Sequence, residues 1–483
     1  MKKLICLSLV ASSTLFAATD LEQLKVQVDK QQHMIEKLLQ KIEKLENKTI
    51  TKDSNNALNV EKIISIQEQV QQDSIISKLS QVGNSSSFSQ NAFIPNISLV
   101  VDTSYVSRNK RDDEIAHLEV PGVVHGLLGA HTDGDVTHST YNANNGFNLN
   151  YAELALSSSV DPYFTMDSIF HLSPQGFEIE EAFVTSTALG YGTRAKAGKF
   201  LSNFGYLNEK HHHAWDFNDM PLVYEGFLGL HGINEVGMQV QWTAPTNTYL
   251  MFGAEAFQGT NEQMFGKDTI GDAEDPIAKA SDGPSLFVAY VKSSVDIGDT
   301  TIFGGISYAN GSSKLDHSGD EEPYAFSGNS ELYGADLLVK HYFDSYSYLS
   351  WQSELLMRDM DGEQYNLDPN DTTLVLSSPN LRKKQSGLYT QLIYSINQSW
   401  KVGARYDTIY KNDVFEDGIN LNEPDSLDKY SAMLEYQTSE FARFRLQYNH
   451  NNALFNEDGL RQDVNTIMLQ ANIAIGAHGA HSF

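Results

Sequence analysis

The chain has 483 residues, and its 34 lysines and arginines stand against 62 aspartates and glutamates, a formal net charge of −28 at pH 7. This acidic excess argues against a nucleic-acid partner, because phosphate groups attract the opposite charge. After the N-terminal region there is no apolar run of about 20 residues, which excludes a helical inner-membrane protein. Tyrosine and phenylalanine are abundant, with 23 and 24 residues beside 12 prolines, which favours a β-rich surface or membrane protein.

Residues 1–17 have the features of a cleaved secretory signal peptide. The basic pair Lys2-Lys3 precedes an apolar stretch, and small residues lead to Ala17. Cys6 is the single cysteine of the chain, and it lies within this peptide. The mature protein is therefore expected to have no thiol, which excludes a disulfide scaffold, a cysteine nucleophile and a thiolate metal site.

Residues 18–82 carry an N-terminal helical pattern in which apolar residues recur every three and four positions. This period of 3.5 residues predicts an α-helical coiled coil and therefore a homo-oligomer, with a lone amphipathic helix packed on another surface as the alternative. A Ser/Asn-rich linker at residues 83–94 ends the helical region. The heptad positions a and d are Leu21, Val28, Ile35 and Ile42, and Leu24, Gln31, Leu38 and Leu45.

From residue 95 to residue 483 apolar and polar residues alternate, which predicts β-strands with one apolar face. Short turns alternate with mostly long connections, as in antiparallel outer-membrane barrels. We therefore predict a membrane all-β fold, a 16-stranded antiparallel β-barrel, and weigh against it a soluble protein of several β-sandwich domains. The predicted strands are 95–108, 146–159, 163–172, 178–187, 193–201, 235–244, 248–257, 284–296, 299–308, 331–343, 346–358, 384–396, 399–410, 428–438, 441–450 and 462–476.

This topology predicts a protein of the Gram-negative outer membrane, with its N-terminal segment in the periplasm. The last strand ends the chain at Phe483, in the position of a C-terminal aromatic barrel-assembly signal. Most of the acidic excess falls in the long connections, which would face lipopolysaccharide and its divalent cations. No other cofactor is expected.

Charged residues on the polar face of the strands would line a water-filled lumen, because charges that face lipid are costly. Opposed acidic and basic side chains would orient dipolar solutes across the pore, or would only pair with one another. The candidate pore-lining residues are Glu153, Asp167, Arg194, Lys196, Glu255, Asp336, Glu354, Arg358, Lys401, Arg405, Glu435, Arg443 and Arg445.

The connection 202–234 contains a cluster of polar and aromatic residues: His211, His212, His213, Trp215 and Asp216. Adjacent imidazoles beside a carboxylate and an indole could line an entrance, bind a metal, contact an aromatic solute or simply be exposed. The stretch 200–229 is long enough to fold into the barrel and narrow it. We favour this constriction role.

A second candidate, in the first long connection, is the sequence HTDGDVTH with His131, Asp133, Asp135 and His138. Alternate spacing brings oxygen and nitrogen ligands within reach of one cation, although a distal glutamate is lacking and a solvated loop is the preferred interpretation. No nucleophile elbow, zinc-protease motif or phosphate-binding loop is found, so we do not expect an enzyme.

Several stretches resemble the legiobactin-type (LbtU) siderophore porins, namely GKFLSNFGYLNEKHHHAWDFNDMPLVYEGFLG, WTAPTNTYLMFGAEAF, the N-terminal heptads and the ending GAHGAHSF. The resemblance implies a sixteen-stranded barrel that takes up an iron chelate, a ferric siderophore, without a TonB-type plug. It transfers no ligand-contact residues.

Two functions follow from these patterns. The first is a porin-like channel for uptake of a small polar solute, with a ferric siderophore as the cargo that the resemblance implies. The second is an envelope tether or adhesion protein that acts through the coiled coil and the acidic loops.

Overall fold

The computed structural model describes residues 95–125 and 141–476, except 175, 187, 262, 273 and 321. The chain divides into two units, residues 1–89 and 90–483, and the described residues belong to the second. The expected signal peptide, coiled coil and linker lie outside the described residues, as do Phe483 and the candidate metal ligands His131, Asp133, Asp135 and His138.

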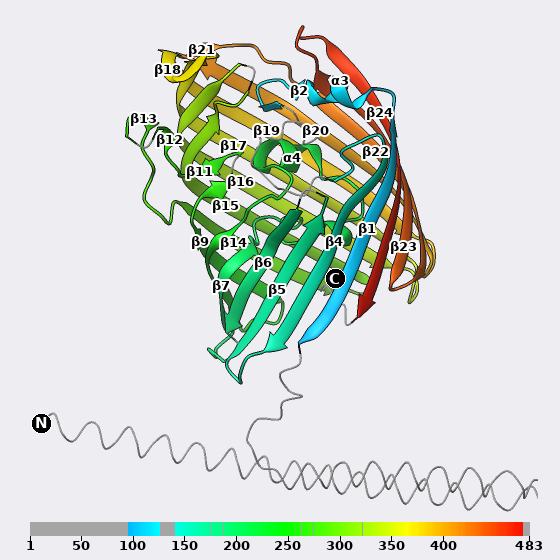
Figure 1. Cartoon of the computed structure of the whole chain (residues 1–483). Coiled ribbons are helices and arrows are strands. Elements are labelled where there is room, and N and C mark those ends of the chain that lie inside the picture. Colours follow the sequence, from blue (N-terminus) through cyan, green and yellow to red (C-terminus); the bar gives the residue numbers. More distant parts are fainter. Residues whose placement is uncertain are drawn as a thin grey trace, which may run out of the picture. The chain divides into compact units, whose positions relative to one another are not determined.

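Sixteen long strands form a closed antiparallel barrel, as the alternating pattern predicts (Figure 1). Each strand pairs with its neighbour along the chain, and β1 closes the ring on β24, where Leu99 lies opposite Ile475. The barrel strands are β1 (Asn96–Arg108), β4 (Gly146–Ser159), β5 (Phe164–Ser173), β6 (Gly176–Ser186), β7 (Thr193–Leu201), β8 (Asn234–Thr243), β9 (Tyr249–Phe257), β14 (Leu286–Ile297), β15 (Thr300–His317), β16 (Tyr324–Tyr342), β17 (Tyr348–Asp368), β19 (Asn380–Ser395), β20 (Trp400–Glu416), β22 (Leu427–Ser439), β23 (Ala442–Phe455) and β24 (Arg461–Gly476).

The long connections contain the remaining short elements. These are α3 (Asp112–Ala116), β2 (Glu119–Val120), β3 (Val124–His125), the 3₁₀ turn η2 (His212–Ala214), α4 (Leu222–Leu228), β10 (Thr260–Asn261), β11 (Phe265–Gly266), β12 (Ile270–Gly271), β13 (Pro276–Ala278), β18 (Asp371–Ser377) and β21 (Ile419–Asn420). Among the described residues, no helix has the length and the apolar character needed to cross a membrane.

The strands β15, β16 and β17 are longer than the sequence pattern predicts, with 18, 19 and 21 residues. The connections predicted at 309–330 and 359–383 are therefore partly strand. Their added residues include charged side chains on the outward face, such as Asp361 and Arg382, which form an exposed ion pair at 3.5 Å. The outward face of such a hairpin is polar, while its inward face carries buried apolar residues such as Leu315, Phe326 and Met360 among polar ones, so the outward apolar alternation that marks a membrane strand is lost there.

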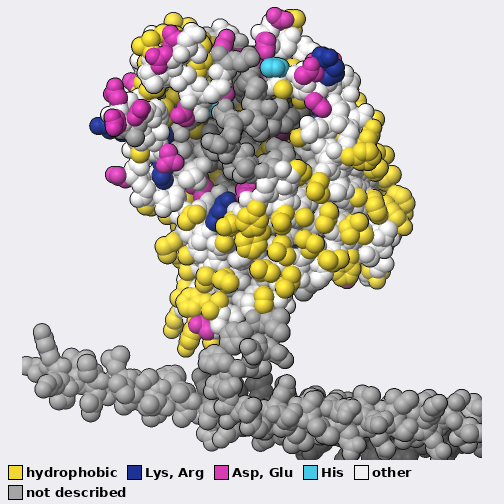
Figure 2. Space-filling model, in the orientation of Figure 1, with side chains coloured by type: hydrophobic (Ala, Val, Ile, Leu, Met, Phe, Trp, Pro, Cys, Tyr) yellow, Lys and Arg dark blue, Asp and Glu magenta, His cyan; other side chains and the backbone are white. Residues whose placement is uncertain are grey.

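The outer surface of the barrel is apolar, and the inner surface is polar. On β23 the side chains of Phe444, Leu446 and Tyr448 are exposed, whereas those of Arg445 and Gln447 between them are buried. Hydrophobic side chains form a broad band over the strands on the face drawn in Figure 2. A closed barrel with this band has the architecture of a membrane-spanning barrel of the outer-membrane type.

The two ends of the barrel differ. One end has short turns, and it holds both the start of β1 and the end of β24, because Ser98 lies opposite Gly476. The other end carries the long connections with β12, β13 and β18 (Figure 1). On the face drawn in Figure 2, acidic side chains gather at this second end.

Leu446 provides a test of the lipid-facing surface, because it is 48% exposed and lies between the exposed residues Leu434 and Leu469. We expect Leu446→Arg to destabilise the folded barrel by about 2–4 kcal/mol, since arginine is costly near the bilayer midplane. Urea unfolding in lipid vesicles, monitored by heat-modifiable electrophoretic mobility, measures the change in the free energy of unfolding. Leu460→Arg, in an exposed turn, is the control and should change stability little; equal effects of the two variants would contradict this placement.

Candidate functional site

The connection between β7 and β8, residues 202–233, folds into the barrel, and we call it the inserted segment. Phe204, Tyr224 and Phe227 of this segment have no exposed surface. Its helix α4 lies within the ring of strands, where it contacts β17, β19 and β20 (Figure 1). The inserted segment is therefore part of the barrel interior, and its contacts define the candidate site.

Apolar side chains of the inserted segment join the inward apolar side chains of the strands in one core cluster. This cluster includes Leu222 and Phe227 of the segment and Leu332 and Ile409 of the wall. Glycine on the wall permits a close approach, since a Cβ atom at Gly334 would lie 2.8 Å from the Phe204 ring. A glycine inside a strand often marks such an approach of another part of the chain.

Carboxylates of the wall accept hydrogen bonds from backbone N–H groups of the inserted segment. The carboxylate of Glu354 on β17 accepts from the N–H groups of Tyr206 and Leu207 at 2.8 and 3.0 Å. The hydroxyl of Tyr224 donates to the same carboxylate at 2.7 Å. On β20, the carboxylate of Asp407 accepts from the N–H of Leu222 at 3.0 Å, next to the start of α4. Such charge-assisted bonds are stronger than neutral ones.

Basic side chains of the wall donate to backbone carbonyl groups of the same segment. Arg358 on β17 donates to the carbonyl of Gly226 at 3.3 Å. Arg405 on β20 donates to the carbonyl of Asp219 at 2.9 Å, and Arg445 on β23 donates to that of Trp215 at 2.9 Å. Irregular stretches and helix ends of a buried segment leave backbone groups unpaired, and these wall residues satisfy some of them.

Asp219 is the ionic centre of the inserted segment. Its carboxylate lies 3.1 Å from Arg405 and 2.8 Å from Lys429, and Asn449 donates to it at 3.0 Å. Burial alone would raise the pKa of Asp219, but the charges of Arg405 and Lys429 hold it well below the ordinary value. Asp219 therefore stays ionised and ties the segment to β20 and β22.

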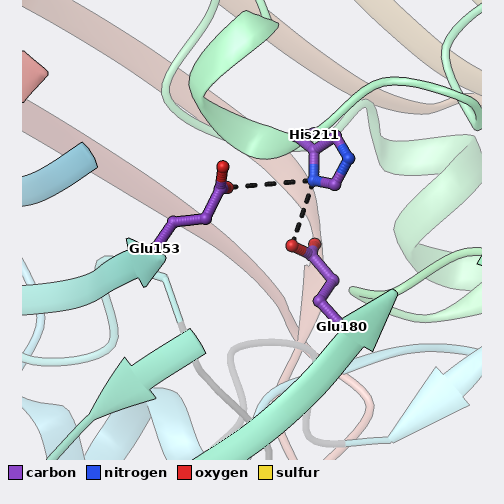
Figure 3. Close-up of side chains that lie close together, drawn as sticks. All are labelled: Glu153, Glu180 and His211. Atoms are coloured by element: carbon purple, nitrogen blue, oxygen red, sulfur yellow. Dashed lines mark hydrogen bonds and ion pairs between the residues drawn. The ribbon is translucent and has the colours of Figure 1, made fainter. Parts of the chain in front are cut away.

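The three consecutive histidines of the segment are buried and differ in their partners. His211 contacts Glu180 through Nδ1 at 3.0 Å and Glu181 through Nε2 at 2.9 Å. Glu153, Glu180 and His211 point toward one another from β4, β6 and the segment (Figure 3).

The next two histidines contact different groups. His213 Nδ1 lies 3.0 Å from the Glu153 carboxylate. His212 contacts the Tyr151 hydroxyl and the carbonyl of Asn218, and its ring stacks on that of Tyr141. Only His211 and His213 of the triplet thus face wall carboxylates.

The environments of His211 and His212 move their pKa values in opposite directions. Burial lowers the pKa of His211, but the Glu180 charge and the hydrogen bonds to Glu180 and Glu181 outweigh it and raise the pKa well above 6.5. Burial is the main cause for His212, and it lowers that pKa. Adjacent imidazoles in one turn therefore differ in how strongly they hold a proton.

No family model matches the chain. It is 44% identical to an uncharacterized protein of Aquifex aeolicus over 399 aligned residues. The aligned region covers 82% of each of the two chains. The chain belongs to the family of that protein.

Solved structures of outer-membrane proteins resemble the fold of this family member at low sequence identity. The outer-membrane expressed OmpT of Vibrio cholerae has a TM-score of 0.44 and 10% identity over 80% of this chain and 99% of that one. The outer membrane channel DcaP of Acinetobacter baumannii has a TM-score of 0.45 and 13% identity, over 80% of this chain and 99% of that one. The anion-selective porin from Comamonas acidovorans has a TM-score of 0.42 and 10% identity, over 79% of this chain and 99% of that one. None of these likenesses is close enough to transfer a solute or a residue role.

The expectation that the charged residues line open water needs correction at the level of the inserted segment. Glu153, Glu255, Glu354, Arg358, Arg405, Glu435 and Arg445 are buried and contact this segment or one another. The physical reason is that the segment brings backbone donors and acceptors into the lumen.

The other predicted lumen residues differ in their surroundings. Lys401 lies 3.2 Å from Glu435, and Arg443 donates to the carbonyl of His213. Lys196 lies over the Phe183 ring at 4.4 Å. Asp336 is buried, whereas Asp167 is half-buried and Arg194 is exposed.

Two further residues of the predicted constriction loop also have partners. The indole N–H of Trp215 donates to the carbonyl of Lys210 at 2.9 Å, within the segment. Asp216 accepts from Gln391 on β19 at 2.9 Å.

Sequence reasoning missed Glu180, Glu181 and His171. The register of β5 and β6 shifts between Ile169 and Phe170, so Glu180 occupies a β-bulge and two consecutive glutamates are buried. Strict alternation would have turned one of the two toward lipid. Adjacent glutamates within a membrane strand, in the sequence EIEEAF, are the signal that could have revealed the bulge.

Glu225 on α4 makes the interior sensitive to pH. Burial raises its pKa to about 7, and the charged groups that face it are Arg108, Asp219, Arg405, Asp407 and Lys429. An unfolded glutamate titrates near 4.5, so the folded state holds the proton more tightly and loses stability as pH rises through about 7.

We therefore expect Glu225→Gln to match the wild type near pH 4.5 and to be more stable by roughly 3 kcal/mol at pH 8. Urea unfolding in lipid vesicles at the two pH values measures this. Glu440→Gln, in an exposed turn, is the control. A stability difference between Glu225→Gln and the wild type that stays constant with pH would contradict the assignment.

Proposed function

We propose that this protein is a porin-like channel of the outer membrane for small polar solutes, and that the inserted segment sets its width. The closed barrel with an apolar outer band supports residence in that membrane. The polar inner face supports passage of polar solutes, since a membrane barrel encloses charges only where they meet water or a charged partner.

The observation that carries the proposal is the anchoring of the inserted segment on several sides of the barrel. The segment is bonded to Glu255 on β9, Glu354 on β17 and Arg445 on β23. It also donates to the hydroxyl of Ser307 on β15 through the N–H of Gly205 at 3.0 Å. A loop that is tied to strands so far apart in the ring acts as a fixed constriction.

Two cavities beside the inserted segment support the proposal that the solute is small. One, of about 20 Å³, is lined by Tyr141, His212 and Trp215. The other, of about 60 Å³, is lined by Arg108, Glu225, Lys429 and Asn449 among others, and it combines both signs of charge. Spaces of this size hold a few water molecules. Ions and small polar molecules would fit spaces of this size better than bulky solutes.

The finer proposal, that the cargo is a ferric siderophore, comes from the resemblance to the legiobactin-type porins. A chelate needs far more room than these cavities offer, so its uptake would require the inserted segment to swing out of the lumen. Labelled ferric-chelate uptake under iron limitation tests this. We expect a deletion strain to lose uptake and the plasmid-borne gene to restore it. Unchanged uptake in the deletion strain would remove the siderophore from the proposal.

Single-channel recording in planar bilayers tests the channel itself. We expect discrete conductance steps for the wild type and steps several-fold larger after residues 206–229 are replaced by a short Gly/Ser linker, because the constriction is then removed. As a control, the same replacement of residues 369–378, around the exposed strand β18, should leave the steps unchanged.

Two results would contradict this function. If the linker variant conducts and the wild type gives no current, the inserted segment is a plug and the protein is closed at rest. If both proteins give steps of equal size, the inserted segment is not the constriction.

A further inference from the structure

A buried cluster of carboxylates and imidazoles lies where the inserted segment meets β4, β5 and β6. Its centre is formed by Glu153 Oε2, Glu180 Oε2 and His211 Nδ1, which all lie within 4.8 Å of one another (Figure 3). His211 Nδ1 is 3.0 Å from the Glu180 oxygen and 3.8 Å from the Glu153 oxygen. Ligand atoms around a tetrahedral ion with bonds of 2.0–2.1 Å lie about 3.3 Å apart, and both imidazole–carboxylate spacings are within about 0.5 Å of that value.

Two more imidazoles approach the same carboxylate oxygens. His171 Nε2 on β5 lies 2.6 Å from Glu180 Oε2 and 3.3 Å from Glu153 Oε2. His213 Nδ1 lies 3.0 Å from Glu153 Oε2. Five side chains from three strands and one segment therefore direct oxygen and nitrogen donors at one small volume.

Glu181 gives the cluster a feature typical of metal sites. Its carboxylate lies 2.9 Å from His211 Nε2, on the far side of the ring from Glu153 and Glu180. A metal-ligating histidine usually donates its second ring N–H to such a carboxylate, which fixes the tautomer and the orientation of the ring. With Glu181 in this place, His211 Nδ1 is directed at the other two carboxylates.

Burial makes a cation favourable at this cluster. Glu153, Glu180 and Glu181 are each at most 6% exposed, and His171 is 1% exposed. Buried carboxylates are costly unless positive charge compensates them. One divalent ion would neutralise Glu153 and Glu180. Imidazole beside carboxylate selects first-row transition ions over Ca²⁺ and Mg²⁺, which prefer oxygen donors alone.

We propose that Glu153, Glu180 and His211, with His171 or His213 as a further ligand, bind one divalent first-row transition-metal ion of the zinc or iron(II) type. The ion ties the inserted segment to β4 and β6. The competing state is a metal-free network of imidazolium and carboxylate ion pairs. The site rests on the geometry of this cluster and is independent of whether the barrel conducts.

Metal counting on the full-length protein, purified without a polyhistidine tag, tests the site. The protein is stripped with a chelator and equilibrated with Zn²⁺ in millimolar Mg²⁺, which occupies oxygen-only sites on the acidic loops. We expect one zinc per chain by mass spectrometry of the metal. Substitution by Co²⁺ should add visible absorption bands typical of nitrogen and oxygen coordination.

Variants separate the ligands from the residue that orients them. Glu180→Gln and His211→Gln should lose the zinc. Glu181→Gln should keep one zinc with affinity weaker by roughly 10–100-fold. His341→Gln is the matched control, because His341 on β16 contacts Thr300 and lies outside the cluster; it should bind as the wild type does.

Heat-modifiable mobility shows whether each variant has folded. If Glu180→Gln fails to fold, the zinc content of His211→Gln and the cobalt spectrum of the wild type show whether the cluster binds the metal. Less than a tenth of one zinc per wild-type chain, or equal zinc in the wild type and in folded His211→Gln, would overturn the site and leave the ion-pair network.

Discussion

The structure depends on one type of interaction, the pairing of charged wall residues with backbone groups of the inserted segment. Strand geometry alone would leave Arg358, Arg405 and Arg445 in a lumen. The segment supplies the carbonyl groups that these guanidinium groups bind. Hydrogen bonds to charged groups contribute about 1.5–3 kcal/mol each, and an uncompensated buried charge costs more. The wall and the segment therefore stabilise each other.

Hydrophobic packing alone would not fix the segment in one position. Its apolar side chains face apolar wall residues on many strands, and a core of this kind tolerates small shifts. The carboxylate of Glu354 is more restrictive, because it accepts two consecutive N–H groups and one hydroxyl. Asp219 adds a second fixed point through Arg405 and Lys429. The polar contacts thus determine where the segment lies, and the apolar contacts determine that it stays inside.

The sequence predicts the barrel well, because a membrane imposes a strict period of two on every spanning strand. The strands β4, β7 and β24 lie within a residue of their predicted ranges. The extensions of β15–β17 could not be predicted, since polar residues replace the apolar ones on their outward faces. The partners of the charged residues could not be predicted either. Alternation places Arg445 on the inner face, but only the folded segment decides that it binds Trp215 and Glu435.

The distribution of charge inside the barrel explains why the histidines lie where they do. The cations that hold the segment from β17 to β23 include Arg358, Arg405, Lys429 and Arg445. On β4 and β6 the wall presents Glu153, Glu180 and Glu181, and besides His171 on β5 it is the segment that brings imidazoles to them. Imidazoles can do so as imidazolium ions or as ligands of a divalent cation. The three carboxylates near His211 and His213 carry three negative charges, and two imidazolium ions supply only two positive ones. His171 supplies the third only if all three rings are protonated. A bound divalent ion and a single imidazolium would together balance the same three carboxylates, and the ion would make the hold on the segment depend on metal supply.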